Sequence, residues 1–146
     1  MIKIGLTGSI ASGKTTAGKI ISRNRGPLFS ADKVVDKLYR KKSFKKFVAR
    51  KLKFKFNSEF KKIIKNKILK SKETLKKLEK IIHPIVRREM FIFLRKNKNK
   101  KLLFFEIPLL VESKLMNFFD VIIFIKSKKN LRLKRYKLRK GNVKLF

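Results

Sequence analysis

The eight residues from Gly8 to Thr15 constrain the fold of this chain more than any other segment. They match the pattern G-x-x-x-x-G-K-[ST] in full. The match follows a mostly apolar run, residues 2–6, and precedes residues 14–23, where apolar or small side chains recur at helical spacing. A glycine-rich loop between a buried strand and a helix presents backbone N–H groups at the positive end of the helix dipole. The segment therefore predicts a loop that binds phosphate groups.

Four residues of this loop have a predicted role that follows from their chemistry. Gly8 and Gly13 permit backbone geometry that a Cβ would obstruct. Lys14 can neutralise the β- and γ-phosphates of a nucleotide, and the Thr15 hydroxyl can ligate Mg²⁺. The loop therefore predicts that the chain binds ATP and Mg²⁺.

Strands and helices alternate along both ends of the chain. After the loop, a short strand is expected over residues 28–30 and a helix over residues 31–40. Apolar runs at residues 102–105 and 120–125 predict two more strands, and a basic helix is expected over residues 130–140. This order is typical of an α/β fold with a doubly wound parallel sheet.

The middle of the chain, residues 43–100, is rich in lysine and has the period of a helix. Its apolar positions form three stripes: Phe44, Phe47 and Val48; Phe60, Ile63, Ile64 and Ile68; and Leu75, Leu78, Ile81, Ile82, Ile85 and Val86. Ser58 is the predicted N-cap of the second helix, and Pro84 is expected to kink the third helix or to split it in two. We interpret the region as a helical insertion in a single domain, whose nucleotide-binding core comprises residues 1–42 and 101–146.

The charge of the chain leaves two classes of partner open. Lys and Arg number 43 against 9 Asp and Glu, so the formal net charge is +34. Such a charge favours nucleic acids or anionic membrane surfaces. The basic residues are spread along the whole chain, however, and we interpret them mainly as compositional drift that produces non-specific nucleic-acid binding in vitro.

Other features of the composition predict a cytoplasmic protein. The chain has no cysteine, which excludes disulfides and thiolate metal sites. No segment reaches the roughly 20 apolar residues that a membrane span needs, and the start of the chain does not have the pattern of a signal peptide. We therefore expect no membrane partner.

Two carboxylates follow predicted strands. Ligands of doubly wound sheets gather where the strands end, so Asp32 is a candidate to accept a proton from an attacking hydroxyl or to hold a metal. Glu106 is a candidate Mg²⁺ ligand. The alternatives are that Asp32 caps the following helix and that Glu106 is an ordinary residue at the end of a strand.

Basic residues near the end of the chain predict a lid over about residues 127–141. Arg132, Arg135 and Arg139 recur at helical spacing, which suits the clamping of phosphates from a mobile segment. In so basic a chain, a solvated helix face is the alternative. His83 is the only histidine, and beside Pro84 on a helical stripe a structural role is its alternative to ligand contact.

Five segments together resemble the dephospho-CoA kinase family. In chain order they are I-G-L-T-G-S-I-A-S-G-K-T-T (4–16), S-A-D (30–32), L-E-K-I-I-H-P-I-V (78–86), E-I-P-L-L-V-E (106–112) and L-K-R-Y-K-L-R (133–139). The His-Pro pair and the P-L-L-x-E segment distinguish this family from adenylate, shikimate and uridine kinases, which lack that combination.

The resemblance implies an ATP-dependent phosphotransferase that phosphorylates the ribose 3′-hydroxyl of dephospho-CoA, the last step of coenzyme A synthesis. It implies Asp32 as general base, with Lys14 and Arg139 also catalytic. The implied ATP-binding residues are Gly8, Ala11, Ser12, Gly13, Lys14, Thr15, Thr16 and Arg135. The implied dephospho-CoA site contains Asp32, His83 and Pro84, and the implied Mg²⁺ ligands are Thr15 and Glu106. We expect a monomer with ATP and dephospho-CoA as its partners.

The chain departs from the family in three places. Residues 8–13 read G-S-I-A-S-G where the family usually has G-G-I-G-S-G, and Ser30-Ala31-Asp32 replaces Asp-Ala-Asp. The family also continues past the lid helix, so we expect a chain shortened at its C-terminus. Two alternatives remain: another small-molecule or nucleoside P-loop kinase, and a catalytically weak relative that binds nucleic acid.

Overall fold

The structure is a computed structural model that describes residues 1–108, 110 and 115–139. The chain divides into two compact units: unit 1 comprises residues 1–32 and 92–146, and unit 2 comprises residues 33–91. Unit 2 overlaps the helical insertion predicted over residues 43–100 but begins and ends earlier in the chain.

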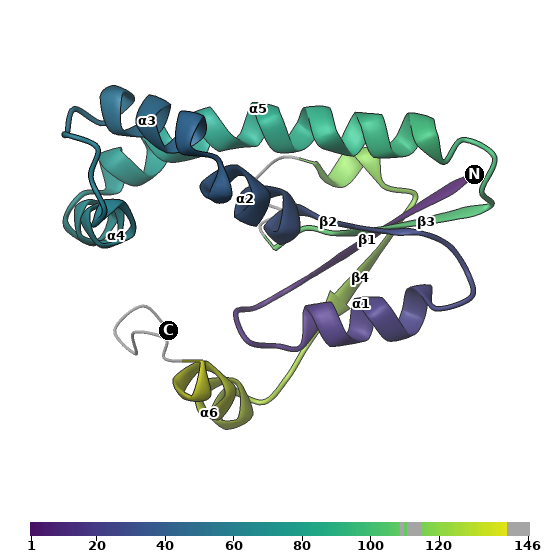
Figure 1. Cartoon of the computed structure of the whole chain (residues 1–146). Coiled ribbons are helices and arrows are strands. Elements are labelled where there is room, and N and C mark those ends of the chain that lie inside the picture. The colour runs from purple at the N-terminus through teal and green to yellow at the C-terminus, as the bar shows by residue number, and fades with distance from the viewer. Residues whose placement is uncertain (109, 111–114, 140–146) are drawn as a thin grey trace. The chain divides into compact units, whose positions relative to one another are not determined.

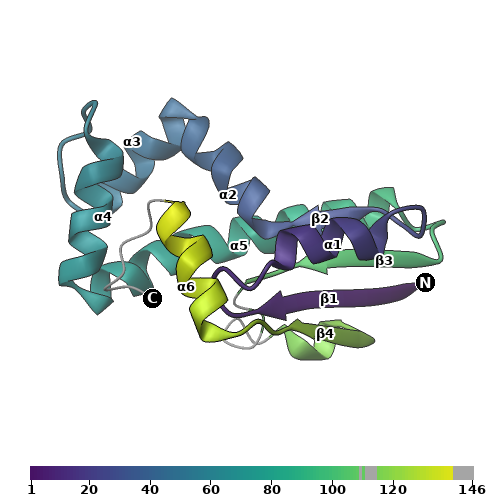
Figure 2. The ribbon, with the colours of Figure 1, turned by 90° about the horizontal axis from the view of Figure 1, so that it is seen from below.

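Unit 1 contains a four-stranded parallel sheet in the part of the chain that the structure describes (Figures 1 and 2). The strands are β1 (Ile2–Gly8), β2 (Leu28–Ser30), β3 (Leu102–Glu106) and β4 (Val121–Ile125), in the order β2-β3-β1-β4. Glu106 pairs in register with Leu6 of β1 and with Ser30 of β2. The ends of three strands therefore lie together, and the predicted parallel α/β sheet is confirmed.

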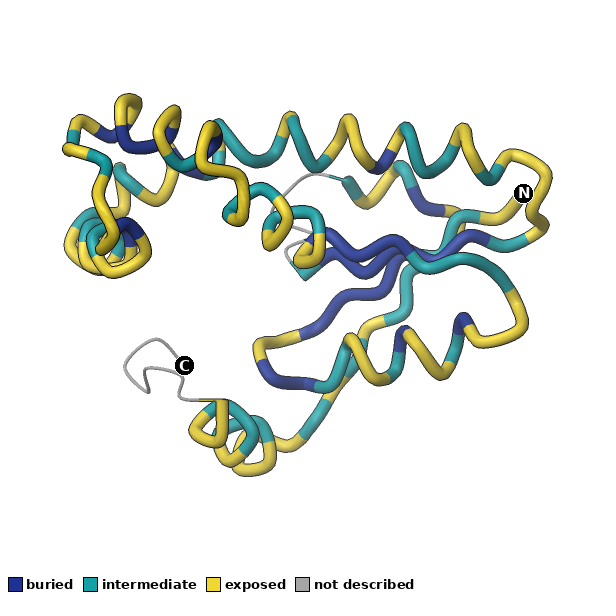
Figure 3. Tube along the Cα trace, viewed as in Figure 1, coloured by how far each residue is buried: buried dark blue, intermediate teal, exposed yellow. Residues whose placement is uncertain are grey.

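The two faces of the sheet are covered by different elements. A Cβ on Gly18 of α1 (Lys14–Ser22) would lie 3.2 Å from the Leu6 side chain and 3.5 Å from that of Leu28, so α1 packs on the face that carries these residues. On the other face, the Phe105 ring contacts the rings of Phe29, Phe93, Phe118 and Phe119. Buried residues accordingly gather in β1, β2 and β3, whereas β4 at the edge of the sheet is partly exposed (Figure 3).

Two further helices begin shortly after strands of unit 1. Helix α2 (Ala31–Arg40) starts directly after β2, and its first two residues belong to unit 1. Helix α6 (Lys129–Leu138) follows β4 and confirms the basic helix predicted near the end of the chain. A short 3-10 helix, η1 (Met116–Phe118), precedes β4.

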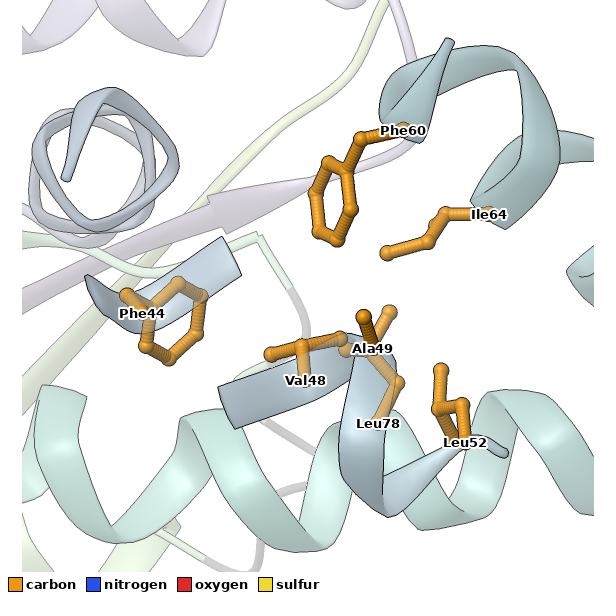
Figure 4. Packing of buried hydrophobic residues seen from close by; sticks show 7 residues of the cluster. All are labelled: Phe44, Val48, Ala49, Leu52, Phe60, Ile64 and Leu78. Atoms are coloured by element: carbon orange, nitrogen blue, oxygen red, sulfur yellow. The ribbon is translucent and has the colours of Figure 1, made fainter. Parts of the chain in front are cut away.

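Unit 2 is helical and has its own apolar core. It contains most of α2, all of α3 (Lys42–Lys51) and α4 (Phe60–Lys70), and the larger part of α5 (Lys72–Lys96). Its buried cluster comprises Phe44, Val48, Ala49, Leu52, Phe60, Ile64 and Leu78 (Figure 4). The rings of Tyr39, Phe54 and Phe56 surround the Phe60 ring at 5.8–6.1 Å. The apolar stripes therefore form a helical core, as their spacing predicts.

Phe47 and Leu75 of the predicted stripes are exposed and do not join that core. Phe47 is 37% exposed, and its ring lies 5.8 Å from the Arg50 guanidinium and 5.8 Å from the Lys51 ammonium. Leu75 is also 37% exposed. Ala49 and Leu52, which the stripes did not include, are buried instead, so the buried face of α3 is rotated toward them.

One local prediction about a helix end is wrong, and one of the two alternatives predicted for Pro84 is excluded. Helix α4 begins at Phe60 and has no side-chain cap, so Ser58 is not its N-cap; Asn57 Oδ1 instead accepts the N–H of Glu59 at 3.0 Å. Helix α5 runs through Pro84 as one element, so it is not split in two. A proline removes only one of the many hydrogen bonds of so long a helix.

No helix in the described ranges is long and apolar enough to cross a membrane.

Candidate active site

The loop between β1 and α1 has the backbone geometry that its glycines predict. A Cβ on Gly8 would lie 2.3 Å from the carbonyl oxygen of Ile125, so only glycine fits there. Gly13 is the N-cap of α1 and has a φ of 97°, a conformation that side chains disfavour. Ala11 also has a positive φ, 56°. Residues with positive φ between residues with negative φ turn backbone N–H groups toward one side of the loop. These groups form an anion-binding nest.

Lys14 lies folded over this loop. Its Nζ donates hydrogen bonds to the carbonyl oxygens of Gly8 at 2.8 Å and Ser9 at 2.9 Å. Burial lowers the pKa of Lys14 below its ordinary value, and the nearby carboxylates of Asp32 and Glu106 partly oppose this effect. The ammonium group is thus held at the phosphate loop with its solvation reduced.

A buried carboxylate stands beside the loop. Glu106 is 1% exposed at the end of β3, and its Oε1 accepts a hydrogen bond from Thr15 Oγ1 at 2.5 Å. Within the described residues, its second oxygen, Oε2, has no hydrogen-bond donor. A buried carboxylate oxygen without a donor is unfavourable unless a cation or an ordered water satisfies it. Glu106 and Thr15 therefore fit a magnesium ion, which prefers oxygen ligands.

The remaining ligands of the ion would be groups other than acidic or histidine side chains. The described part of the chain contains no group of three or more histidine, aspartate or glutamate side chains that could hold a metal. Magnesium is usually held by one or two protein groups together with phosphates and water. The pair of Thr15 and Glu106 agrees with that pattern.

Several of the residues that the sequence predicted to be catalytic or ligand-binding line one cavity. It has a volume of about 460 Å³ and is lined by residues 7–16 of β1 and the loop together with Asp32, Glu106, Pro108, Phe124 and Arg139. Asp32 lies inside the first turn of α2, which begins at Ala31, so it is not the cap of that helix. Asp32 lines the same cavity as Lys14, and its carboxylate raises the pKa of that lysine, against the lowering caused by burial.

A second cavity of about 490 Å³ adjoins the loop. Ser12, Gly13, Thr16 and Arg139 line both cavities. The second cavity also has apolar walls from Ala17, Ile20 and Leu138, and Arg135 faces it.

A model of the dephospho-CoA kinase family matches residues 2–144 of the chain. The chain belongs to that family. The dephospho-CoA kinase of Zymomonas mobilis is 35% identical over 135 residues, which cover 86% of this chain and 65% of that protein. The dephospho-CoA kinase of Fusobacterium nucleatum is also 35% identical, with coverage of 90% and 70%. The chain thus spans about two thirds of the length of these relatives.

Solved structures share the fold. The Thermus thermophilus protein TT1252 superposes with a TM-score of 0.77 at 26% identity, over 99% of this chain and 75% of that one. The dephospho-CoA kinase of Campylobacter jejuni superposes with a TM-score of 0.53 at 22% identity, over 94% and 95% of the two chains, which shows the fold alone.

The structure brings together only part of the site that the dephospho-CoA kinase resemblance implies. Lys14, Thr15, Asp32, Glu106 and Arg139 share the first cavity. Arg135 lies at the second cavity. His83 and Pro84 belong to α5 within unit 2, where His83 is half-buried and Pro84 is exposed, and their contact with substrate stays a prediction. The segment 106–112 is described only at residues 106–108 and 110.

Sequence reasoning did not find two polar contacts of the loop. Ser127 Oγ donates to the carbonyl oxygen of Ser12 at 2.8 Å, and Thr7 Oγ1 donates to that of Pro108 at 3.2 Å. Ser127 belongs to no recognisable motif, and Thr7 stands one residue before the G-x-x-x-x-G-K-[ST] pattern. The only signal for Ser127 was its place just after β4, where strand ends gather ligands.

Proposed function

We propose that this member of the dephospho-CoA kinase family transfers the γ-phosphate of ATP to the ribose 3′-hydroxyl of dephospho-CoA. The observation that carries the proposal is the single cavity that places Lys14, Asp32 and the Thr15–Glu106 pair around one phosphate loop. The cavity could accept several alcohols, and membership of the family supports dephospho-CoA as the acceptor.

The loop binds the polyphosphate of ATP. Its backbone N–H groups and the N-terminus of α1 attract the phosphate oxygens, and Lys14 exchanges its bonds with the carbonyls of Gly8 and Ser9 for bonds to phosphate. Because Lys14 gains an anionic partner in exchange for neutral carbonyls, its charged form becomes more favourable when the nucleotide binds. The adenosine part is assigned to the second cavity, where apolar walls and Arg135 lie beside the loop.

Thr15 and Glu106 hold Mg²⁺ in this proposal. When bound, the ion neutralises negative charge on the phosphate oxygens and orients them. The Glu106 carboxylate then gains a cation for the oxygen that the described residues leave without a donor.

Asp32 acts on the acceptor. Its carboxylate takes the proton of the ribose 3′-hydroxyl while the bond from that oxygen to the γ-phosphorus forms and the bond from the γ-phosphorus to the β-γ bridging oxygen breaks. ADP leaves with the bridging oxygen. Arg139, which lines the same cavity, stabilises the negative charge of the transferred group.

The remaining parts of the proposal concern binding and context. His83 and Pro84 bind the dephospho-CoA acceptor, and α6 acts as a lid that limits the access of water. The protein works as a cytoplasmic monomer.

A coupled assay of ADP release tests the function. The purified chain with Mg²⁺·ATP is expected to release ADP in the presence of dephospho-CoA, and Asp32→Asn is expected to lower kcat by roughly 100-fold or more because the general base is lost. Nucleosides and nucleoside monophosphates serve as alternative acceptors. Faster turnover of any of these would assign a different acceptor, and an absence of ADP release with every acceptor would overturn the kinase proposal.

A further inference from the structure

A group of three hydrogen bonds joins the phosphate loop to the segment that follows β4. Ser127 Oγ donates to the carbonyl oxygen of Ser12 at 2.8 Å. Arg135 Nη1 donates to the same carbonyl at 3.3 Å and to Ser127 Oγ at 3.4 Å. Ser12 itself is only 3% exposed. The orientation of one buried peptide group of the loop is therefore held from outside the loop.

The orientation of this peptide decides where the next amide points. In a planar trans peptide the N–H of one residue points opposite to the carbonyl of the residue before it. The Ser12 carbonyl points toward Ser127 and Arg135, so the Gly13 N–H points to the other side of the loop. Gly13 lines both the second cavity and the first, where Lys14 and Glu106 lie, whereas Ser127 and Arg135 line only the second. An amide that points away from Ser127 and Arg135 is therefore available to an anion in the first cavity.

The Ile10–Ala11 peptide, two residues earlier in the loop, also has its carbonyl approached by a donor from outside the loop. Arg132 Nη1 approaches the carbonyl oxygen of Ile10 at 3.5 Å, again from α6. Ala11 and Gly13, the residues that follow the two held carbonyls, are both in the positive-φ region. Figure 2 shows α6 beside the loop that connects β1 to α1. Donors on the α6 side thus hold alternate carbonyls, and alternate amides stay available for an anion.

We propose that Ser127 is a positioning residue that fixes the Ser12–Gly13 peptide so that the Gly13 amide faces the phosphates of the bound nucleotide. This role rests on the proposed function, because it needs a phosphate ligand in the first cavity. Ser127 does not line that cavity, and its hydroxyl is connected to the phosphate loop through the Ser12 carbonyl. Without its hydroxyl, the peptide keeps only the longer bond from Arg135, and a rotated peptide would turn a carbonyl oxygen toward the phosphate oxygens.

The test compares three variants with the wild-type chain. Ser127→Ala removes the hydroxyl, and Ser127→Thr keeps it. Ser71→Ala is the matched control, because Ser71 Oγ accepts the N–H of Thr74 at 3.2 Å in unit 2 and its loss removes one serine hydrogen bond remote in sequence from the loop. The probe is ADP with Mg²⁺ in about 0.3 M salt, where a Debye length of roughly 6 Å screens diffuse attraction to the basic chain.

Ser127→Ala is expected to raise the Kd for ADP by about 3- to 10-fold, the range of a single hydrogen bond, and Ser127→Thr to restore it to within about 2-fold. Ser71→Ala should leave the Kd unchanged. A second readout uses ¹⁵N-glycine labelling, since the chain has 6 glycines. ADP should shift the Gly13 amide signal in the wild type and shift it much less in Ser127→Ala, while the Gly26 signal stays in place.

Two results would overturn the role of Ser127 alone: wild-type ADP affinity in Ser127→Ala, or an unchanged ADP-induced shift of the Gly13 amide in that variant. Equal weakening by Ser127→Ala and Ser71→Ala would also overturn it, because the effect would then be general destabilisation. If the wild type bound neither ADP nor ATP, the proposed function would fail first, and the positioning role with it.

Discussion

The polar side chains of the two units make contacts over very different distances along the chain. In unit 1, hydrogen bonds connect Lys3 with Asp120, Thr15 with Glu106, and Ser127 with Ser12, across 117, 91 and 115 positions. In unit 2, the contacts of Lys62 with Glu59, Lys77 with Glu73, and Thr74 with Ser71 cover 3 or 4 positions.

This difference suggests that unit 1 provides the catalytic residues and that the apolar core of unit 2 provides the stability of its helices. A parallel sheet brings remote strand ends together, so unit 1 can assemble a site from residues that are far apart in sequence. Unit 2 is held by the cluster around Phe60, and its exposed ion pairs contribute little. Changes in unit 1 should therefore affect catalysis, and changes in the core of unit 2 should mainly affect stability.

The largest expected effect is in the core of unit 2. Phe60 is 2% exposed, and Phe60→Ala should lower the free energy of unfolding by about 3–5 kcal/mol, since it removes a large apolar side chain and leaves a cavity. Urea denaturation measures the change. A loss below about 1 kcal/mol would show that the helical cluster does not stabilise the fold. That result would contradict the division of stability and catalysis between the two units.

Lys14→Ala tests the corresponding claim for unit 1. The variant should lower kcat/KM by about 10²–10³-fold, because a charge preorganised at the phosphates is lost. The urea midpoint should change little, since the bonds of Lys14 go to two carbonyls of its own loop. The exposed Lys77→Ala is the matched control and should keep wild-type kinetics. Similar kinetic losses in both variants would contradict the assignment of chemistry to the loop.

Asp120 and Glu59 sharpen the comparison of remote and local contacts. Asp120 Oδ2 accepts the backbone N–H of Lys3 at 2.7 Å, so Asp120→Ala should destabilise the protein by about 1–1.5 kcal/mol. Glu59 pairs with Lys62 on the surface, and Glu59→Ala should cost only about 0.2–0.5 kcal/mol. Urea denaturation of both variants gives the two values. An equal loss in both would remove the distinction.

Ala11 and Lys53 provide a matched pair of backbone positions. Their φ angles are 56° and 54°, in the region that favours glycine. Lys53 follows the end of α3, where the N–H of Phe54 bonds the carbonyl of Ala49, as helix ends commonly do. Either residue changed to glycine should stabilise the protein by about 1 kcal/mol.

Only the change in the loop should also alter nucleotide binding. Ala11→Gly is expected to change the Kd for ADP, because Ala11 lines the phosphate cavity, whereas Lys53→Gly should leave it unchanged. Thermal unfolding and ADP titration of both variants give the answer. Altered ADP affinity in Lys53→Gly would show that the loop is not an independent binding element.

The parts predicted well from the sequence are those whose signals are local. The phosphate loop, its flanking strand and helix, and the strand that ends at Glu106 each follow from a few neighbouring residues. The position of Glu106 beside Thr15 follows from the rule that parallel strands end at one edge of the sheet.

The parts that the sequence did not reveal depend on tertiary packing. Phe47 belongs to an apolar stripe, but the rotation of α3 in its cluster leaves it exposed. Pro84 lies inside one continuous helix, so the break that the sequence allowed there does not occur. Ser127 contacts the loop because the end of β4 brings it there, and its place after a strand was the only signal in the sequence for that contact.

The central claim is that the loop of unit 1 binds nucleotide phosphates with the help of magnesium. Calorimetry of ADP binding to the whole chain, with and without Mg²⁺ in about 0.3 M salt, tests it most directly. The account predicts one site per chain, weaker binding when Mg²⁺ is removed, and a large loss of affinity in Lys14→Ala. Binding at several weak sites that is indifferent to Mg²⁺ and survives Lys14→Ala would contradict it.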